Sequence, residues 1–182
     1  FLTHFHSDHI TGLPDVVLLT WAAGRTNPLA VYGGPGVEQV VSGFSTALGI
    51  DNGYRTAHHG AATMPPDGGR MVPHTIALPD GASETTVLDE GGVRIVAFRV
   101  SHAPVSPAYG YRIEAGGRSV VISGDTTPVP TLVAAAKDAD VLIHEALAPH
   151  MVAAIGDTLR GLGDTRRAKI MGDIPNYHTS PV

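Results

Sequence analysis

Hydrophobic and polar positions along the chain predict helices and strands in mixed order. Apolar residues between positions 37 and 48 recur at helical spacing, which predicts a helix with one buried face ending near Gly49. Further helices are expected over residues 10–22, 130–139 and 149–162. Short apolar runs predict strands at 29–32, 72–78, 85–88, 93–100, 109–114, 118–123 and 141–143, the last of them buried. Because strands come in runs and helices follow some of them, we expect an α/β or layered α+β fold.

Glycine and proline divide these elements. Gly116-Gly117 stands between two strand signals and predicts a hairpin. Residues 51–70 are rich in Gly, Pro and His and are predicted to form a long loop or lid. The Gly-Gly-Pro-Gly run at 33–36 is interpreted as a structural turn, because it lacks the Lys and Ser/Thr of a phosphate-binding loop.

Composition narrows the function classes. The 182 residues suit one domain, and 12 Lys and Arg against 17 Asp and Glu disfavour a general nucleic-acid binder. The absence of Cys excludes disulfides, a thiolate zinc site and a cysteine nucleophile. No apolar run approaches the length of a membrane span, so we expect no membrane association and a cytoplasmic location. Ten His remain as candidates for metal binding and proton transfer.

The first nine residues contain a dense group of metal-ligand types. In an extended chain the side chains of His4 and His6 lie on the same side, while Asp8 and His9 fall at the turn into a helix. A carboxylate beside imidazoles suits zinc, iron or manganese, and the number of ligands suits two adjacent ions. The alternative is a chance polar cluster on a loop, which the density of ligand types disfavours.

This His-X-His-X-Asp-His pattern resembles the signature of the metallo-β-lactamase superfamily. Four later motifs follow in an order similar to the ribonuclease Z and arylsulfatase-like branch of that superfamily. They are His102 after a strand, Ser123-Gly124-Asp125-Thr126, His144-Glu145-Ala146 and His178-Thr179-Ser180. The resemblance covers nearly the whole chain and implies an αββα four-layer sandwich.

The resemblance also implies a dinuclear hydrolase site. Two ions are expected, zinc in the first place and manganese or iron as alternatives, which activate a water molecule against an ester. The resemblance implies that His4, His6 and His102 bind one ion, that Asp8 and His9 bind the second, and that Asp125 bridges both. It also implies that His178 is the general acid and that Glu145 keeps His178 oriented and charged. Asp8 is also counted among the catalytic groups.

The sequence departs from the family pattern at both ends. Members of the branch normally have strands ahead of the first motif and one more metal-binding His after the His178 motif. We therefore expect residues 1–182 to form a single metallo-β-lactamase-like domain that lacks its N-terminal strands and its C-terminal end, an internal fragment of a longer enzyme.

The substrate is predicted from what the chain lacks. In many bacterial ribonucleases Z a tRNA-gripping arm lies between the positions that match His102 and Asp125, where this chain has 22 residues that a hairpin fills. With the acidic balance, this favours a small anionic ester, such as a phosphodiester or aryl sulfate, over tRNA as the alternative. A β-lactam or lactone hydrolase and an inactive metal-binding homologue are further alternatives. The resemblance suggests a homodimer.

Weaker candidates lie outside these motifs. Tyr111 and Arg112 could position an anionic substrate, although alternate facing in a strand allows only one of them to point at the site. His58-His59 is either an exposed part of the predicted lid or a wall facing the substrate. His144 is expected in the core or behind the ligands, and His74 and His150 are expected on the surface or in packing.

Overall fold

The structure, a computed structural model, describes residues 1–181. Contacts divide the chain into two compact units, Phe1–Ala77 and Leu78–Val182, which are described separately below. Each unit combines strands with helices, which confirms the predicted mixed α/β class. Within the described residues, none of the helices has both the length and the hydropathy needed to cross a bilayer. The single domain expected over residues 1–182 stays a prediction.

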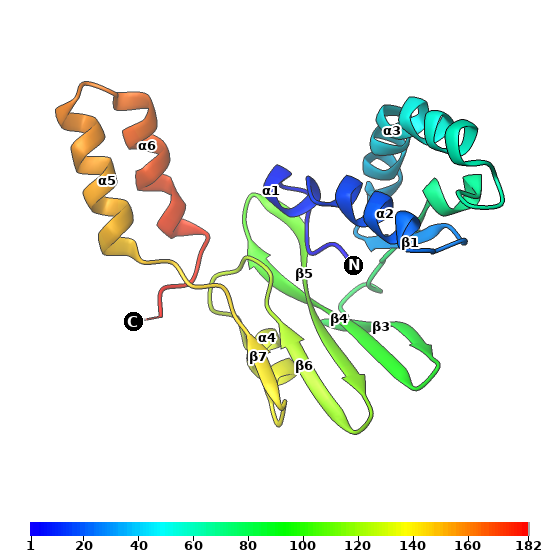
Figure 1. Cartoon of the computed structure of the whole chain (residues 1–182). Helices are drawn as coiled ribbons and strands as arrows, with labels where there is room; N and C mark the ends of the chain where they lie inside the picture. Colours follow the sequence, from blue (N-terminus) through cyan, green and yellow to red (C-terminus); the bar gives the residue numbers. More distant parts are fainter. Residues whose placement is uncertain (182) are drawn as a thin grey trace. The chain divides into compact units, whose positions relative to one another are not determined.

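The first unit holds a two-stranded parallel sheet covered by helices (Figure 1). Its elements are α1 (Ser7–Ile10), α2 (Leu13–Ala22), β1 (Leu29–Gly33), α3 (Val37–His59), the 3₁₀ helix η1 (Pro66–Gly69) and β2 (Met71–Thr75). Apolar side chains of α2, α3 and both strands meet in one core, formed by Leu13, Val17, Val31, Val37, Val41 and Met71. The burial of this shared face stabilises both the helices and the short sheet.

Helix α3 is longer than the sequence pattern predicts. The helix runs on to His59, so the expected helix end near Gly49 is wrong and the expected loop over 51–70 is wrong for residues 51–59. Residues 60–65 lie outside helices and strands, as expected. One interior glycine costs a helix only about 1 kcal/mol. Beyond it, the Asn52 amide donates a hydrogen bond of 2.9 Å to the carbonyl of Gly69 and ties the helix to the following segment. A tertiary contact therefore outweighs the local breaker signal.

The second unit is built on a five-stranded sheet in the order β3-β4-β5-β6-β7 (Figure 1). The strands are β3 (Glu84–Glu90), β4 (Val93–His102), β5 (Val105–Ala115), β6 (Arg118–Ile122) and β7 (Val141–Ile143). The helices are α4 (Pro130–Ala136), α5 (Pro149–Gly161), α6 (Thr165–Asp173) and the 3₁₀ helix η2 (Ile174–Asn176). The predicted hairpin is confirmed, with positive φ angles of 57° and 75° at Gly116 and Gly117.

The pairing of β6 with β7 is parallel, whereas the other neighbours in this sheet are antiparallel. Parallel strands end at the same edge, so the loops that follow β6 and β7 lie together. Strand β7 was expected to be buried, which is wrong: Val141, Leu142 and Ile143 are 48, 47 and 54% exposed. The reason is that β7 is the last strand in the sheet and pairs with β6 alone.

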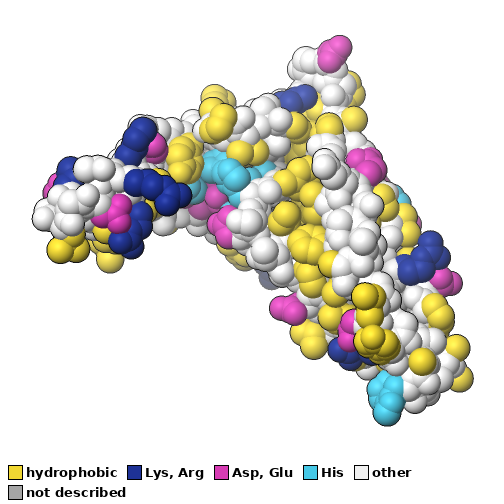
Figure 2. Space-filling view, turned by 90° about the horizontal axis from the view of Figure 1, so that it is seen from above, with side chains coloured by type: hydrophobic (Ala, Val, Ile, Leu, Met, Phe, Trp, Pro, Cys, Tyr) yellow, Lys and Arg dark blue, Asp and Glu magenta, His cyan; other side chains and the backbone are white. Residues whose placement is uncertain are grey.

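Helices α5 and α6 form an antiparallel hairpin within the second unit (Figure 1). Helix α6 has no counterpart among the predicted elements. It is capped at its N-terminus by Asp164, whose carboxylate accepts a hydrogen bond of 2.9 Å from the backbone N–H of Arg167. Figure 2 shows basic and acidic side chains next to one another over this hairpin, and one such pair joins Lys169 to Asp173 at 2.8 Å.

Candidate metal centre and catalytic residues

The first histidine motif lies at the start of the first unit. Residues 1–6 form neither a helix nor a strand, the backbone of His6 is extended, and α1 begins directly after it. The Thr3 hydroxyl contacts Nδ1 of the buried His4 ring at 3.1 Å, and Nε2 of the same ring lies 3.0 Å from Nδ1 of His6. Two nitrogens bound tetrahedrally to one zinc ion are about 3.3 Å apart. The spacing of these two nitrogens therefore fits a shared metal ion.

Asp8 and His9 lie in α1, at the turn where the sequence places them. The Asp8 carboxylate is 3.5 Å from Nε2 of His9 and is 79% exposed. The His9 ring also packs against the His4 ring, with centroids 4.2 Å apart. The motif thus offers three grouped imidazoles and one accessible carboxylate, a donor set that suits zinc.

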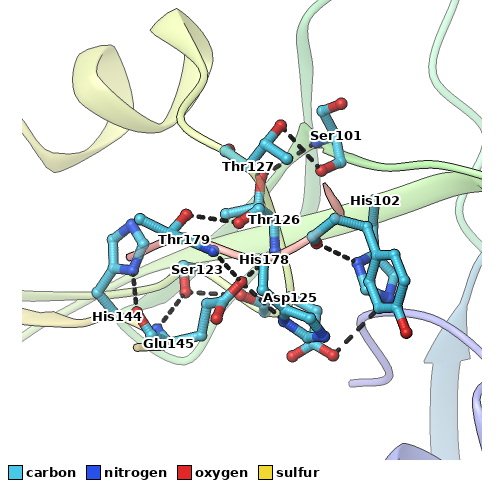
Figure 3. Close-up of polar contacts among 12 residues, drawn as sticks. Ser101, His102, Ser123, Asp125, Thr126, Thr127, His144, Glu145, His178 and Thr179 are labelled. Carbon is cyan, nitrogen blue, oxygen red and sulfur yellow. Dashed lines mark hydrogen bonds and ion pairs between the residues drawn. The ribbon is translucent and has the colours of Figure 1, made fainter. Parts of the chain in front are cut away.

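A second cluster is assembled within the second unit from three distant segments. His102 ends β4, Asp125 follows β6 and His178 follows η2, and one ligand atom from each lies within 4.8 Å of the others. Nε2 of His102 is 3.7 Å from the Asp125 carboxylate (Figure 3). Nδ1 of His102 is 2.9 Å from the carbonyl of Tyr177. Because a carbonyl can only accept, Nδ1 is the donor in this contact, and a metal would bind through Nε2.

Glu145 holds the His178 ring of this cluster in position. Its Oε1 atom accepts hydrogen bonds from the backbone N–H groups of Thr126 at 2.9 Å and Thr179 at 3.1 Å. Nδ1 of His178 lies 3.1 Å from the same oxygen (Figure 3). The carboxylate therefore orients the His178 ring through Nδ1 and leaves Nε2 available for proton transfer. The structure thus brings Glu145 and His178 together, and their catalytic roles stay predictions.

Ser123 fixes the position of Glu145 through a hydrogen bond to its backbone. The Ser123 side chain is almost fully buried, and its hydroxyl accepts the Glu145 backbone N–H at 3.0 Å. The same hydroxyl donates to the carbonyl of Gly124 at 2.7 Å. It thereby links the loop that carries Asp125 to the loop that carries Glu145.

Several contacts in this cluster were not predicted. Thr126 and Thr179 stand in motifs that the sequence analysis singles out, yet no role was assigned to them. Tyr177 acts through its backbone carbonyl, which every residue type possesses, so its identity carries no signal. Ser123 stands in the Ser-Gly-Asp-Thr motif, but the motif assigns it no role.

Arg112 does not join the cluster. Its guanidinium donates to Glu114 at 2.8 Å and to the carbonyls of Ala135 and Lys137 at 2.7 and 3.0 Å, which satisfies the end of α4. Tyr111 is buried, and burial raises the pKa of its hydroxyl well above the ordinary value. The suggested role of these residues in positioning an anionic substrate is therefore not supported.

The remaining histidines lie elsewhere in their units. His144 sits behind Glu145, with Nδ1 2.6 Å from the Glu145 carbonyl, as expected for a residue behind the ligands. His58 and His59 meet edge to face, with ring centroids 4.7 Å apart, at the end of α3 rather than in a loop. His74 stacks on Tyr32 with ring centroids 4.5 Å apart, which agrees with a packing role.

Residues 1–166 match the family model described as the beta-lactamase superfamily domain. The chain belongs to the metallo-β-lactamase superfamily, as the histidine motifs predict. It is 38% identical over 185 residues to the putative ribonuclease Z of Mycobacterium tuberculosis (strain CDC 1551 / Oshkosh), covering 98% of this chain and 72% of that protein. It is also 38% identical to the ribonuclease Z of Mycobacterium bovis (strain BCG / Pasteur 1173P2), covering 98% of this chain and 58% of that protein.

Solved structures agree on the fold. The short form of human tRNase Z aligns with a TM-score of 0.57 and 21% identity, over 87% of this chain and 61% of the human one. The metallo-beta-lactamase fold protein YhfI from Bacillus subtilis aligns with a TM-score of 0.51 and 20% identity, over 80% and 49% of the two chains. This chain therefore spans between about half and three quarters of the length of the relatives it matches.

Proposed function

We propose that the protein is a metal-dependent phosphodiesterase of the ribonuclease Z type, with precursor tRNA as its substrate. The observation that carries the proposal is the His178 ring, held by Glu145 next to His102 and Asp125. A proton donor beside metal ligands suits cleavage of an ester with an oxygen leaving group. The mycobacterial relatives with the same chain segment are named ribonuclease Z.

This proposal prefers tRNA over a small anionic ester, whereas the sequence favours the small ester over tRNA. The sequence favours a small ester because no tRNA-gripping arm fits between His102 and Asp125 and because acidic residues outnumber basic ones. The alignment with the M. tuberculosis relative has 185 positions and covers 98% of a 182-residue chain, so that relative has room for only a few extra residues in the same stretch. A protein named ribonuclease Z thus shares the short spacing. The comparisons give no support to an aryl sulfate or another small ester.

We assign metal binding to donors in both units. In the first unit His4, His6, Asp8 and His9 would act as ligands, supported by their nitrogen spacing and their mixed donor set. In the second unit His102 and Asp125 would act as ligands, supported by the contact of Nδ1 with the Tyr177 carbonyl, which leaves Nε2 of His102 facing the Asp125 carboxylate. Two zinc ions are proposed, and when bound they would acidify a water molecule and stabilise negative charge at the phosphorus.

The protein residues supply orientation and the proton. The Tyr177 carbonyl keeps His102 in one tautomer, so its binding nitrogen needs no rearrangement. Glu145 holds Nδ1 of His178 and directs Nε2 away from itself. From there Nε2 would donate its proton to the oxygen that leaves as the P–O bond breaks.

The test is His178→Ala, assayed as zinc-loaded protein on precursor tRNA and on bis(p-nitrophenyl) phosphate. We expect turnover to fall by a factor of ~100 or more, while the zinc content stays that of the wild type. His144→Ala is the matched control, because that ring touches only the backbone of Glu145 in this network. Loss of zinc in His178→Ala would instead make His178 a ligand, and unchanged turnover would remove it from the acid role.

A panel of substrates separates the proposed function from its alternatives. Cleavage of precursor tRNA by the zinc-loaded wild type supports the ribonuclease Z assignment. Cleavage of an aryl sulfate or a β-lactam without cleavage of tRNA would replace it with one of the other hydrolase classes. Zinc binding without hydrolysis of any of these compounds would identify an inactive homologue.

A further inference from the structure

Three separate segments of the second unit meet in a closed ring of hydrogen bonds (Figure 3). The Thr126 and Thr179 N–H groups both donate to Oε1 of Glu145, at 2.9 and 3.1 Å. The Thr179 hydroxyl donates to the Thr126 carbonyl at 2.5 Å and closes the ring. The loop after β6, the loop after β7 and the segment after η2 are thereby joined at one point.

The Thr179 hydroxyl is the one side-chain donor in this ring. Thr126 is fully buried, so water has little access to replace a donor at its carbonyl. The Thr126 hydroxyl is already engaged, since it accepts the Ser101 N–H at 3.1 Å and donates to the Thr127 carbonyl at 2.6 Å. Thr126 is therefore a rigid anchor, and Thr179 is the group that attaches the C-terminal segment to it.

The two residues that precede Thr179 both contact the proposed site. The Tyr177 carbonyl holds Nδ1 of His102, and the His178 ring is held by Glu145. On the other side, the Thr179 carbonyl accepts the Leu147 N–H at 2.8 Å, which fixes the backbone at that position. A shift of the segment at Thr179 would therefore displace the supports of both histidine rings.

We propose that Thr179 is a positioning residue of the hydrolytic site. Its hydroxyl holds residues 177–179 against Thr126, so that one hydrogen bond sets the orientation of His102 and of His178 together. This inference rests on the proposed function. The side-chain hydroxyl of Thr179, and not the volume of its side chain, is responsible for this orientation of the two histidine rings.

The experiment compares Thr179→Val, which keeps the shape and removes the donor, with Thr179→Ser, which keeps the donor. Thr158→Val is the matched control, because it removes a hydroxyl-to-carbonyl bond of 2.9 Å from the exposed face of α5. In Thr179→Val we expect the amides of Thr126 and Thr179 to exchange with solvent roughly tenfold faster. We also expect kcat to fall roughly 10–100-fold at unchanged zinc content, with little change in KM. Thr179→Ser and Thr158→Val should behave as the wild type.

Wild-type exchange and kcat in a folded Thr179→Val would overturn the inference. Equal losses in Thr179→Ser would do the same, because the hydroxyl is still present there. If Thr179→Val is not recovered folded, the Thr179→Ser variant decides. Exchange of the Thr126 and Thr179 amides as slow as in the wild type supports the inference, and faster exchange contradicts it. Amide exchange is measured without substrate and does not depend on activity. An inactive wild-type protein would therefore contradict the proposed function, whereas the exchange data would still show whether Thr179 holds residues 177–179 in place.

Discussion

The proposed ligand group of the first unit and the cluster of proposed ligands and general acid in the second unit are built in opposite ways. The group in the first unit is contiguous, since His4, His6, Asp8 and His9 come from six successive positions. The cluster in the second unit draws His102, Asp125 and His178 from the ends of three separate elements. A contiguous motif needs only an extended strand end and one helical turn to bring its donors together. An assembled cluster needs correct strand pairing and loops that are tied to one another.

This difference appears in the surroundings of the histidine rings. The exposed His6 ring contacts His4, a residue two positions away. The buried His102 ring bonds the carbonyl of Tyr177, a residue 75 positions away. The His4–His6 contact is thus local, whereas the His102–Tyr177 contact depends on the tertiary structure of its unit.

The largest expected effects come from removing one ligand of each kind. Both His6→Ala and His102→Ala should lose zinc and lower turnover by roughly 10³-fold. This effect is larger than that expected for removing a residue that contacts a metal ligand but not the metal itself. Without metal the two variants should differ. His102→Ala leaves the Tyr177 carbonyl without this partner and should lower the free energy of unfolding by about 1–3 kcal/mol. His6→Ala should change it by less than about 0.5 kcal/mol, as for an exposed residue.

Zinc analysis, turnover and urea unfolding of the metal-free proteins measure these differences. His150→Ala is the control, an exposed histidine in the first turn of α5 that belongs to neither ligand group. Equal destabilisation by His6→Ala and His102→Ala would contradict the distinction between local and tertiary support.

The same contrast explains what could be predicted from the sequence. The contiguous motif is visible from residue types and spacing alone, and the structure places its members as expected. Single members of the assembled cluster, such as Asp125, look like ordinary turn residues, and only the order of the family motifs singled them out. The extension of α3 and the exposure of β7 depend on tertiary contacts and sheet order, which local periodicity does not contain.

A smaller effect is expected from the packing of the sheet beneath the assembled cluster. Gly110 in β5 lies opposite Phe98 in β4, and a Cβ atom there would lie 2.3 Å from the Phe98 ring and 2.9 Å from the Ile122 carbonyl. Gly110→Ala should therefore lower the free energy of unfolding by about 1–3 kcal/mol. Gly43→Ala is the matched control in α3, where no atom lies within 4 Å and a gain of about 0.5–1 kcal/mol is expected. Equal values in thermal unfolding would contradict the packing argument.

The smallest effect concerns the start of the β6–β7 pair, whose register brings the loops of Asp125 and Glu145 together. The Arg118 side chain, and next to it the Ser119 backbone N–H, lower the pKa of the Asp140 carboxyl. Since the pKa in the folded state is below that in the unfolded state, ionised Asp140 stabilises the fold above about pH 4, and this contribution is lost as the pH falls through the folded pKa. Asp140→Asn should therefore unfold with a shallower acid dependence in urea titrations between pH 7 and pH 3. In an Arg118→Gln background the substitution should change that dependence less, and an equal change in both backgrounds would show that Arg118 is not the cause.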